Sequence, residues 1–223
     1  MATMRATFHE SDPAPHARAA PIVFVVDDDV SVRESLDALI RCVGWAAECY
    51  ASARDFLARP RCLAPSCLLL DVHLPDLNGL DLQERVAADR VEMPIIFITG
   101  YGDIPMTVRA MKAGAFEFLT KPFDEDVLLD AIRKAIERSR AALGDEDAMR
   151  SLKGRYASLS RREREVMALV VSGLLNKQVA AELGISEITV KAHRGSVMRK
   201  MQAASLPNLV NMAARLGLQA PCD

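Results

Sequence analysis

Side chains able to take part in phosphoryl chemistry follow four short apolar runs in the first half of the chain. They are Asp27 with Asp28, Asp71, Thr99 and Lys121. Apolar runs of this length, separated by amphipathic stretches, are typical of buried parallel strands that alternate with helices. Because ligands bind at the carboxyl ends of the strands in such sheets, we expect these side chains to converge in one crevice.

Each residue type suits a different part of a phosphoryl site. Carboxylates packed together repel one another, so Asp27, Asp28 and Asp71 predict a bound cation, and oxygen ligands favour Mg²⁺. A carboxylate can also act as a nucleophile and form an aspartyl phosphate. Lys121 would bring a positive charge to the phosphate, and Thr99 a hydroxyl donor. Together they would neutralise the charge that spreads over the transferring oxygens.

The segments around these residues predict the elements that position them. Ser52 and Asp124 are residue types that commonly cap helix N-termini. A weaker strand is expected near 46–50, and helices are expected at 30–43, 52–58, 79–88, 104–113 and 124–143. Five strands with intervening helices predict one α/β domain with a doubly wound, five-stranded parallel sheet.

The composition excludes several protein classes. Half of the 223 residues are hydrophobic and 26% are charged, as in ordinary globular chains. The sequence has neither an apolar stretch of roughly 18 to 20 residues nor the apolar segment of a signal peptide. We therefore expect a cytoplasmic protein without membrane contact, and a disordered extension over residues 1–20. The five cysteines lack the CxxC and Cys–His spacings of zinc sites, so we expect reduced thiols.

The charges are divided unevenly along the chain. Residues 1–154 hold eighteen Lys and Arg against twenty-five Asp and Glu, a net charge of −7. Residues 155–223 hold ten against five, a net charge of +5, and the whole chain carries −2. A basic second part favours a polyanionic partner for that part.

From Ser158 onward the pattern is that of an all-α, four-helix domain. Ser160 and Glu163 form the signature of a capping box at the start of the first helix. The turn 183–186 joins the second and third helices and fits a helix-turn-helix. The four helices are expected near 160–173, 176–183, 186–201 and 205–216.

The third of these helices carries residues suited to contact with nucleic acid. Lysine and arginine neutralise phosphates, and a recognition helix reads base edges from the major groove. The basic residues are Lys191, Arg194, Arg199 and Lys200. The apolar residues assigned to packing are Ile188, Val190, Val197 and Met201. The single Trp and the three Tyr lie outside this helix, which disfavours the base stacking of single-strand binders.

The first domain resembles the receiver domain of two-component response regulators. The resemblance is carried, in matching order and spacing, by residues 25–29, 70–79, 98–100, 113–115 and 121–123. It implies a flavodoxin-like fold in which a sensor histidine kinase phosphorylates Asp71. It also implies that Asp28, Asp71 and the backbone carbonyl of His73 hold Mg²⁺, with Asp27 orienting a metal-bound water.

The same resemblance implies a conformational switch. Lys121 would contact the phosphoryl group, next to a cis peptide bond to Pro122. Thr99 would move toward a phosphoryl oxygen, and Phe118 would turn inward to fill the space. Many relatives carry Arg or Met where this chain has His73. Because the metal uses the carbonyl, this departure should preserve metal binding.

The second domain resembles the LuxR-type DNA-binding domain, and the two domains together resemble FixJ-like regulators. The segments that carry these resemblances are 159–166, 173–180 and 185–193, and 99–106 for the FixJ-like match. A helix-turn-helix over about 176–195 is implied. Lys191, Ala192 and Gly195 would face the bases, and Lys177, Thr189, His193 and Arg194 would lie near the DNA backbone. Glycine inside a helix costs about 1 kcal/mol relative to alanine, which close approach to DNA would compensate.

These inferences combine into a phosphorylation-activated transcriptional regulator. We expect a receiver domain over 21–139, a helical, acidic linker over 140–156 and a DNA-binding domain over 157–220. Phosphorylation would promote a homodimer through the helix 104–113 and the last strand. The dimer would bind double-stranded promoter DNA and contact RNA polymerase.

Two alternatives stay open at this point. One is an Mg²⁺-dependent aspartyl-phosphate phosphatase, although such enzymes typically carry a second acid where this chain has His73. The other is a DNA-binding regulator that never uses phosphate, of which RNA binding is a variant. The complete phosphoryl site argues against the second alternative. We therefore predict a regulator rather than an enzyme, with autodephosphorylation as its only catalysis.

Overall fold

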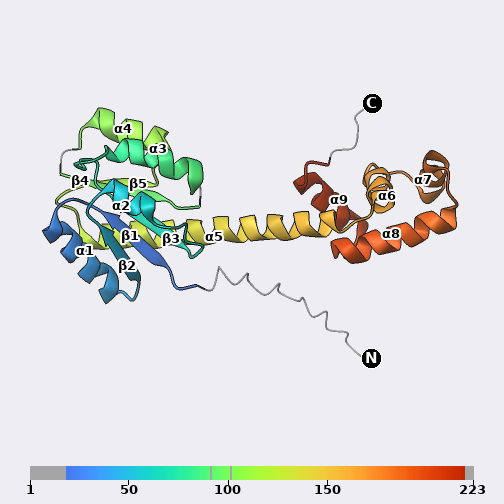
Figure 1. Cartoon of the computed structure of the whole chain (residues 1–223), viewed down its shortest axis with the longest axis horizontal. Helices are drawn as coiled ribbons and strands as arrows, with labels where there is room; N and C mark the ends of the chain where they lie inside the picture. Colours follow the sequence, from blue (N-terminus) through green and yellow to red (C-terminus); the bar gives the residue numbers. More distant parts are fainter. Residues whose placement is uncertain (1–18, 91, 101, 219–223) are drawn as a thin grey trace, which may run out of the picture. The chain divides into compact units, whose positions relative to one another are not determined.

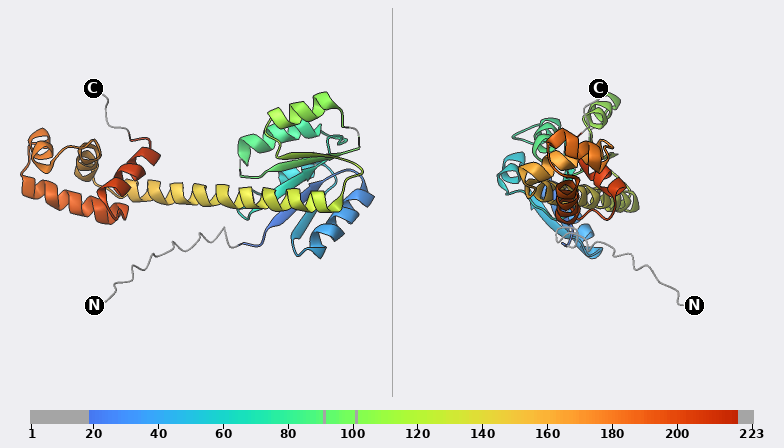
Figure 2. Two further views of the ribbon diagram at one scale, coloured as in Figure 1. Left: turned by 180° about the vertical axis from the view of Figure 1, so that it is seen from behind. Right: turned by 90° about the vertical axis from the view of Figure 1, so that its right-hand side faces the viewer.

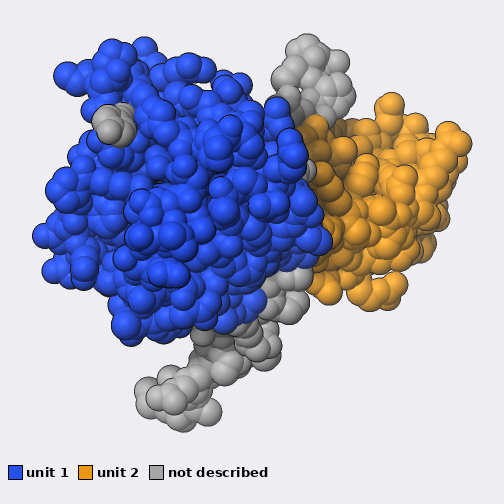
Figure 3. Space-filling model, turned by 60° about the vertical axis from the view of Figure 1, so that its left-hand side comes forward, with its two compact units in different colours: residues 1–145 blue, residues 146–223 orange. Residues whose placement is uncertain are grey.

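The computed structural model describes residues 19–90, 92–100 and 102–218. The expected disordered extension over residues 1–20 therefore lies almost entirely outside the described residues. The chain divides into two compact units, residues 1–145 and 146–223, which Figure 3 colours separately. No described helix is long and apolar enough to cross a membrane. Cys222 lies outside the described residues, and the described cysteines are free thiols: Cys42, Cys49, Cys62 and Cys67.

The first unit is built on a five-stranded parallel sheet with the strand order β2-β1-β3-β4-β5 (Figure 1). The strands are β1 Ile22–Val26, β2 Ala46–Tyr50, β3 Ser66–Leu70, β4 Ile95–Thr99 and β5 Glu117–Thr120. β3 and β4 are buried along their whole length, which explains their continuous apolar sequences. The predicted doubly wound parallel sheet is confirmed.

The helices of this unit cover both faces of the sheet (Figure 2). They are α1 Val30–Cys42, α2 Ala53–Ala58, α3 Gly79–Asp89, α4 Ile104–Lys112 and α5 Glu125–Ala157. Strand residues such as Leu68 and Phe97 pack against α2, α3 and α4. Their neighbours along the strands, such as Leu69 and Ile96, pack against α1 and α5. This two-sided core fixes the ends of the central strands, where the polar residues lie.

One predicted helix boundary is absent. The helix expected over 124–143 and the helical linker expected over 140–156 form one continuous helix, α5, which runs to Ala157 through Gly144 and Gly154. Glycine weakens a helix without forbidding it, and packing decides the outcome. The last turns of α5 place Leu152 in a core of the second unit, and Arg150 forms ion pairs with acidic residues one turn earlier.

In the described part of the second unit, four helices follow the end of α5, as predicted. They are α6 Arg161–Val171, α7 Asn176–Leu183, α8 Glu187–Met201 and α9 Leu206–Arg215. Ser160 and Glu163 form the predicted capping box, and Ser186 caps α8. Gly184 ends α7 with a φ of +64°, a left-handed conformation that favours glycine. This residue makes the tight turn of the helix-turn-helix.

Glu163 joins the start of α6 to α8. Its side chain is buried, with 6% of the residue exposed. It accepts hydrogen bonds from the Lys200 ammonium (2.7 Å), the Ser196 hydroxyl (2.5 Å) and the Ser160 N–H (2.7 Å). These donors, Lys200 foremost, favour the ionised form and lower the pKa of Glu163 from 4.5 to about 2. The cluster therefore fixes α8 against α6.

We expect Glu163→Gln to destabilise the second unit in a pH-dependent way. The folded unit keeps Glu163 ionised where the unfolded chain protonates it. The stabilisation is therefore fully present above about pH 4.5 and is lost as the pH falls toward about 2. At neutral pH the loss should be roughly 2 kcal/mol, measured by hydrogen exchange of the α8 amides in the full chain.

Acid unfolding followed by circular dichroism checks the pH dependence of Glu163→Gln. The difference in stability between wild type and variant should shrink through the acid range. Glu182→Gln, on the exposed surface of α7, is the matched control and should change stability little. A difference that stays constant down to pH 2 would contradict the role given to Glu163.

Candidate functional site

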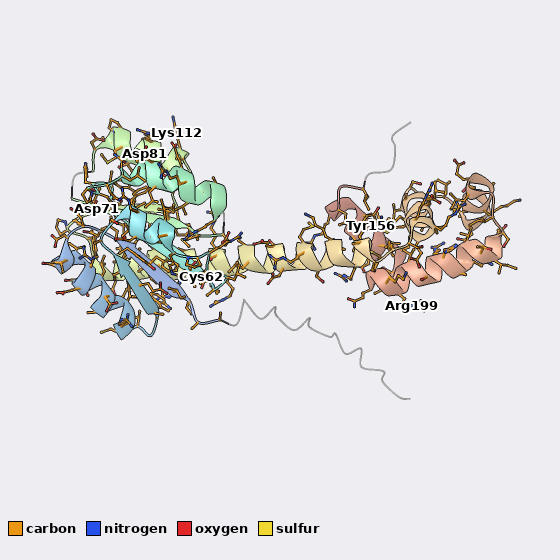
Figure 4. The ribbon with its side chains drawn as sticks, in the orientation of Figure 1. Cys62, Asp71, Asp81, Lys112, Tyr156 and Arg199 are labelled. Carbon is orange, nitrogen blue, oxygen red and sulfur yellow. The ribbon has the colours of Figure 1, made fainter. Side chains whose placement is uncertain are left out.

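The polar residues that follow the strands meet at one edge of the sheet in the first unit. Asp27 and Asp28 follow β1, Asp71 follows β3, Thr99 ends β4 and Lys121 follows β5. One ligand atom from each of the three aspartates lies within 4.8 Å of the others. Figure 4 labels Asp71, which lies where β3 ends. The structure thus brings together residues that span almost a hundred positions of the sequence.

Strand register is what aligns these residues. Val26 pairs with Leu70, so the next residues of both strands, Asp27 and Asp71, lie side by side. The Asp71 N–H donates to the Val26 carbonyl at 2.9 Å, which extends the ladder by one bond beyond the strands. The Lys121 N–H donates to the Thr99 carbonyl at 2.8 Å in the same way.

Lys121 brings an ammonium group to this site. Its Nζ lies 2.7 Å from Asp27 Oδ2 and 3.5 Å from Asp71 Oδ2. The peptide bond from Lys121 to Pro122 is cis, as the resemblance implied. Asp27 is buried and also accepts a hydrogen bond from the Asp29 N–H at 2.9 Å. Asp27 is therefore held in place, whereas the more exposed Asp28 and Asp71 face the opening of the site.

The donor set fits Mg²⁺. Three carboxylates and one ammonium group leave a formal charge of −2, which one divalent cation balances. All the donors are hard oxygen atoms, and the cluster contains no thiolate or imidazole of the kind that zinc prefers. Mg²⁺ binds through few carboxylates and keeps several waters, which suits a site open to solvent.

The loop between β3 and α3 folds back so that its end lies against its own start at Asp71 and Val72. The Gly79 N–H donates to the Val72 carbonyl at 2.8 Å. A Cβ at Gly79 would lie 2.4 Å from the Asp71 carbonyl oxygen, so only glycine fits at this position. His73, whose backbone carbonyl was the expected metal ligand, lies in this loop with an exposed residue surface, and its N–H donates to Asp71 Oδ1 at 3.3 Å.

Asp76 is a positioning residue of the same loop that sequence reasoning missed. Its carboxylate accepts hydrogen bonds from the N–H groups of Ala53 (3.2 Å) and Arg54 (2.9 Å), at the start of α2. Burial opposes this ionised carboxylate, but hydrogen bonds from backbone N–H groups, that of Arg54 foremost, together with the charge of Arg54 outweigh it and lower the pKa of Asp76. The only local signal was an aspartate in a turn, because its partners lie more than twenty residues earlier.

The two expected switch residues lie on neighbouring strands. Thr99 is fully buried at the end of β4. Phe118 on β5 pairs with Phe97, and the two ring centroids are 5.9 Å apart. Phe118 is half-buried and lies against Gly102, where an added Cβ would come within 3.0 Å of the ring. The aromatic side chain therefore lies at the margin of the core near the site.

The DNA-binding residues expected in the second unit divide into two groups. Thr189 and Arg194 already make bonds within the protein: the Thr189 N–H donates to Ser186 Oγ at 3.1 Å, and Arg194 donates to Asn176 Oδ1 at 2.9 Å. His193 is half-buried beside them on α8. The expected residues with exposed surface are Lys177 on α7, and Lys191, Ala192 and Gly195 on α8.

The assignment of Ile188 to the packed face of α8 is wrong. Ile188 is 80% exposed, whereas Val190, Val197 and Met201 are buried as expected. Helical spacing explains the difference, because residues 188 and 190 point about 200° apart around the helix. Arg199, labelled in Figure 4, is also exposed on α8.

Comparison with protein families gives one match for each unit. Residues 23–133 match the response regulator receiver domain family. Residues 157–213 match the luxR family of bacterial regulatory proteins. Both matches agree with the resemblances found in the sequence.

Individual relatives match nearly the whole chain. Nodulation protein W of Bradyrhizobium diazoefficiens is 52% identical over 92% of this chain and 90% of its own length. The transcriptional regulatory protein FixJ of Azorhizobium caulinodans is 45% identical over 90% of this chain and 95% of its own length.

Solved structures lead to the same family. The response regulator StyR has a TM-score of 0.81 and 47% identity, covering 88% of this chain and all of that one. Full-length FixJ from B. japonicum has a TM-score of 0.53 and 40% identity, covering 89% of this chain and 98% of that one. The chain therefore belongs to the FixJ-like response regulators of two-component systems, which are phosphorylation-dependent transcriptional regulators with a receiver domain and a LuxR-type DNA-binding domain.

Proposed function

We propose that Asp71 is the phosphoacceptor of this regulator and that its phosphorylation by a sensor histidine kinase activates DNA binding. The observation that carries the proposal is the meeting of Asp71 with Lys121 and two further carboxylates at the sheet edge. The proposed domains are a receiver over 21–139, a helical linker over 140–156 and a DNA-binding domain over 157–220. Because promoter DNA is the proposed partner, we also propose that the protein acts in the cytoplasm.

The transfer can be written for the groups of this chain. An Asp71 carboxylate oxygen attacks the phosphorus of a phosphohistidine, so a P–O bond forms as the P–N bond breaks, and the departing imidazole takes up a proton. Lys121 Nζ, 3.5 Å from Asp71 Oδ2, neutralises charge on the phosphoryl oxygens. Thr99 donates its hydroxyl to one of them. Water later hydrolyses the acyl phosphate, which is the autodephosphorylation that we propose for this site.

The residues that would hold Mg²⁺ are Asp28, Asp71 and the His73 carbonyl, with Asp27 orienting a bound water. When bound, the ion supplies positive charge to the transferring phosphoryl oxygens. The ion pair between Lys121 Nζ and Asp27 Oδ2 is 2.7 Å long. If it breaks, Lys121 can turn toward the phosphoryl group.

A groove beside the site fits the approach of the kinase. It is lined by Val32, Leu36 and Leu39 of α1 and by Pro122 and Phe123 after Lys121. Because the phosphohistidine must reach Asp71 next to Lys121, we propose that a helix of the kinase lies in this groove. Its apolar residues suit the apolar stripe of a partner helix.

An exposed apolar stripe on α4 supports dimerisation. Ile104, Val108 and Met111 are exposed large apolar residues spaced by four and three positions, so they share one helix face. We propose that the phosphorylated receiver forms a homodimer through this face of α4 and β5. Two DNA-binding domains then bind two half-sites of promoter DNA, where the dimer contacts RNA polymerase.

Asp71→Asn should abolish phosphorylation of the full chain by acetyl phosphate in the presence of Mg²⁺. The amide removes the nucleophilic oxygen anion but leaves Asp28 and Lys121 in place. Asp81→Asn, an exposed aspartate on α3, is the control and should be labelled like wild type. Phosphate-affinity gel electrophoresis measures the labelled fraction. Normal labelling of Asp71→Asn would overturn the assignment, and sustained hydrolysis of phosphate esters would instead favour a phosphatase.

Val108→Glu should weaken the phosphorylation-dependent homodimer by about tenfold or more, because it places a charge in an apolar interface. Sedimentation of the phosphorylated full chain measures the dimer affinity. Val43→Glu is a matched control, since Val43 is 45% exposed at the end of α1 and Val108 is 44% exposed. Equal dimer affinity in both variants would exclude the α4 face.

Lys191→Ala should weaken binding to promoter DNA and reduce the slope of log affinity against log salt by about 1 if Lys191 neutralises one phosphate. If Lys191 contacts a base, affinity should fall mainly for the preferred sequence. Lys153→Ala, an exposed lysine near the end of α5, controls for net charge. Fluorescence anisotropy over a salt series makes the comparison. An identical loss in the two variants would show a general charge effect and no special role for Lys191.

A further inference from the structure

Ile188 is a large apolar side chain that neither core of the second unit uses. It is the second residue of α8 and is 80% exposed. The two apolar clusters of this unit do not include it among the described residues. A single exposed isoleucine is ordinary on a protein surface, so its exposure alone indicates no partner. Its position on α8 is the observation that indicates a partner.

Ile188 shares a helix face with the residues proposed to face the bases. Lys191, Ala192 and Gly195 follow it by three, four and seven positions, the spacing of one helical stripe. The buried residues Val190 and Val197 lie on the other side of α8. Ile188 also lies in the first turn of α8, and recognition helices contact base edges with their N-terminal residues.

Two of the residues that follow Ile188 along this stripe have small side chains or none. Ala192 carries one methyl group and Gly195 none, and a Cβ built at Gly195 meets no atom within 4 Å. The α8 backbone can therefore approach a groove closely, with Ile188 projecting at one end of the stripe. Among the base edges of the major groove, the apolar group is the C5 methyl of thymine.

We propose that Ile188 determines specificity by packing against a thymine methyl group in each half-site. The inference rests on the proposed binding of DNA by α8 and adds the chemical group that is read. Lys191, one turn along the same face, supplies the polar contact beside it.

A thymine-to-uracil exchange tests the contact one methyl group at a time. The full chain, phosphorylated with acetyl phosphate, selects a preferred duplex from a randomised pool. Each thymine of that duplex is then replaced by uracil, which keeps every base-pair hydrogen bond. Burial of one methyl group predicts that wild type binds about fourfold more weakly when the contacted position carries uracil.

The protein variant completes a double-mutant cycle. Ile188→Ala should bind the thymine duplex more weakly than wild type does and should not distinguish thymine from uracil at that position. Because Ile188 is exposed, the variant should keep the helical content of wild type. Leu175→Ala, 71% exposed before α7, is the matched control and should retain the fourfold discrimination.

Four results would count against the inference. Equal thymine discrimination by wild type and Ile188→Ala would show that another group reads the methyl. Unchanged DNA affinity of Ile188→Ala with reduced transcription would show that Ile188 contacts RNA polymerase instead. Failure of phosphorylated wild type to enrich any duplex would remove the proposed function itself, whereas enrichment without any uracil effect would remove this inference alone.

Discussion

Mutual repulsion among the carboxylates at the ends of β1 and β3 is the constraint on which the first unit depends. Two like charges about 5 Å apart repel by about 3 kcal/mol at an effective dielectric constant of 20. Here three carboxylates come within 4.8 Å of one another. The buried parallel strands fix the backbone in spite of this repulsion, and Lys121 offsets part of it through Asp27. A site whose carboxylates repel one another should respond strongly to an added cation, as the proposed switch requires.

The same parallel topology explains how much could be predicted from the sequence. Continuous apolar runs indicated the central strands, because both faces of a parallel sheet are covered, and the ends of those runs indicated the phosphoryl site. The continuity of α5 through Gly144 could not be predicted from local residues. Gly144 is a weak helix former, but Leu152 lies in one core with Met201 and Leu209, which are about fifty residues further along. The length of α5 therefore depends on contacts between residues that are far apart in the sequence.

The functional residues, too, could be predicted only in part from the sequence. Asp71 and Lys121 could be found because strand ends converge in every sheet of this kind. The role of Asp76 depends on backbone N–H groups of Ala53 and Arg54, which local sequence does not mark. Ile188 was misassigned because apolar type was taken as a sign of burial, although the helical period separates it from Val190. The apolar runs predicted which polar residues would meet at the sheet edge, whereas long-range partners and helix phase required the folded structure.

The contacts that α8 makes within the second unit support the proposed binding of two copies to DNA. Lys200 and Ser196 are engaged with Glu163, and Arg194 is engaged with Asn176, so these polar groups hold the helix in place. Few side chains remain for base edges, and each good base contact is worth about 1–3 kcal/mol. The free energy of specific binding must exceed that of non-specific binding by about 4–10 kcal/mol. The base contacts of one short helix face are too few to supply this difference with ease. The proposed phosphorylation-dependent dimer would double these contacts and so tie sequence recognition to the state of Asp71.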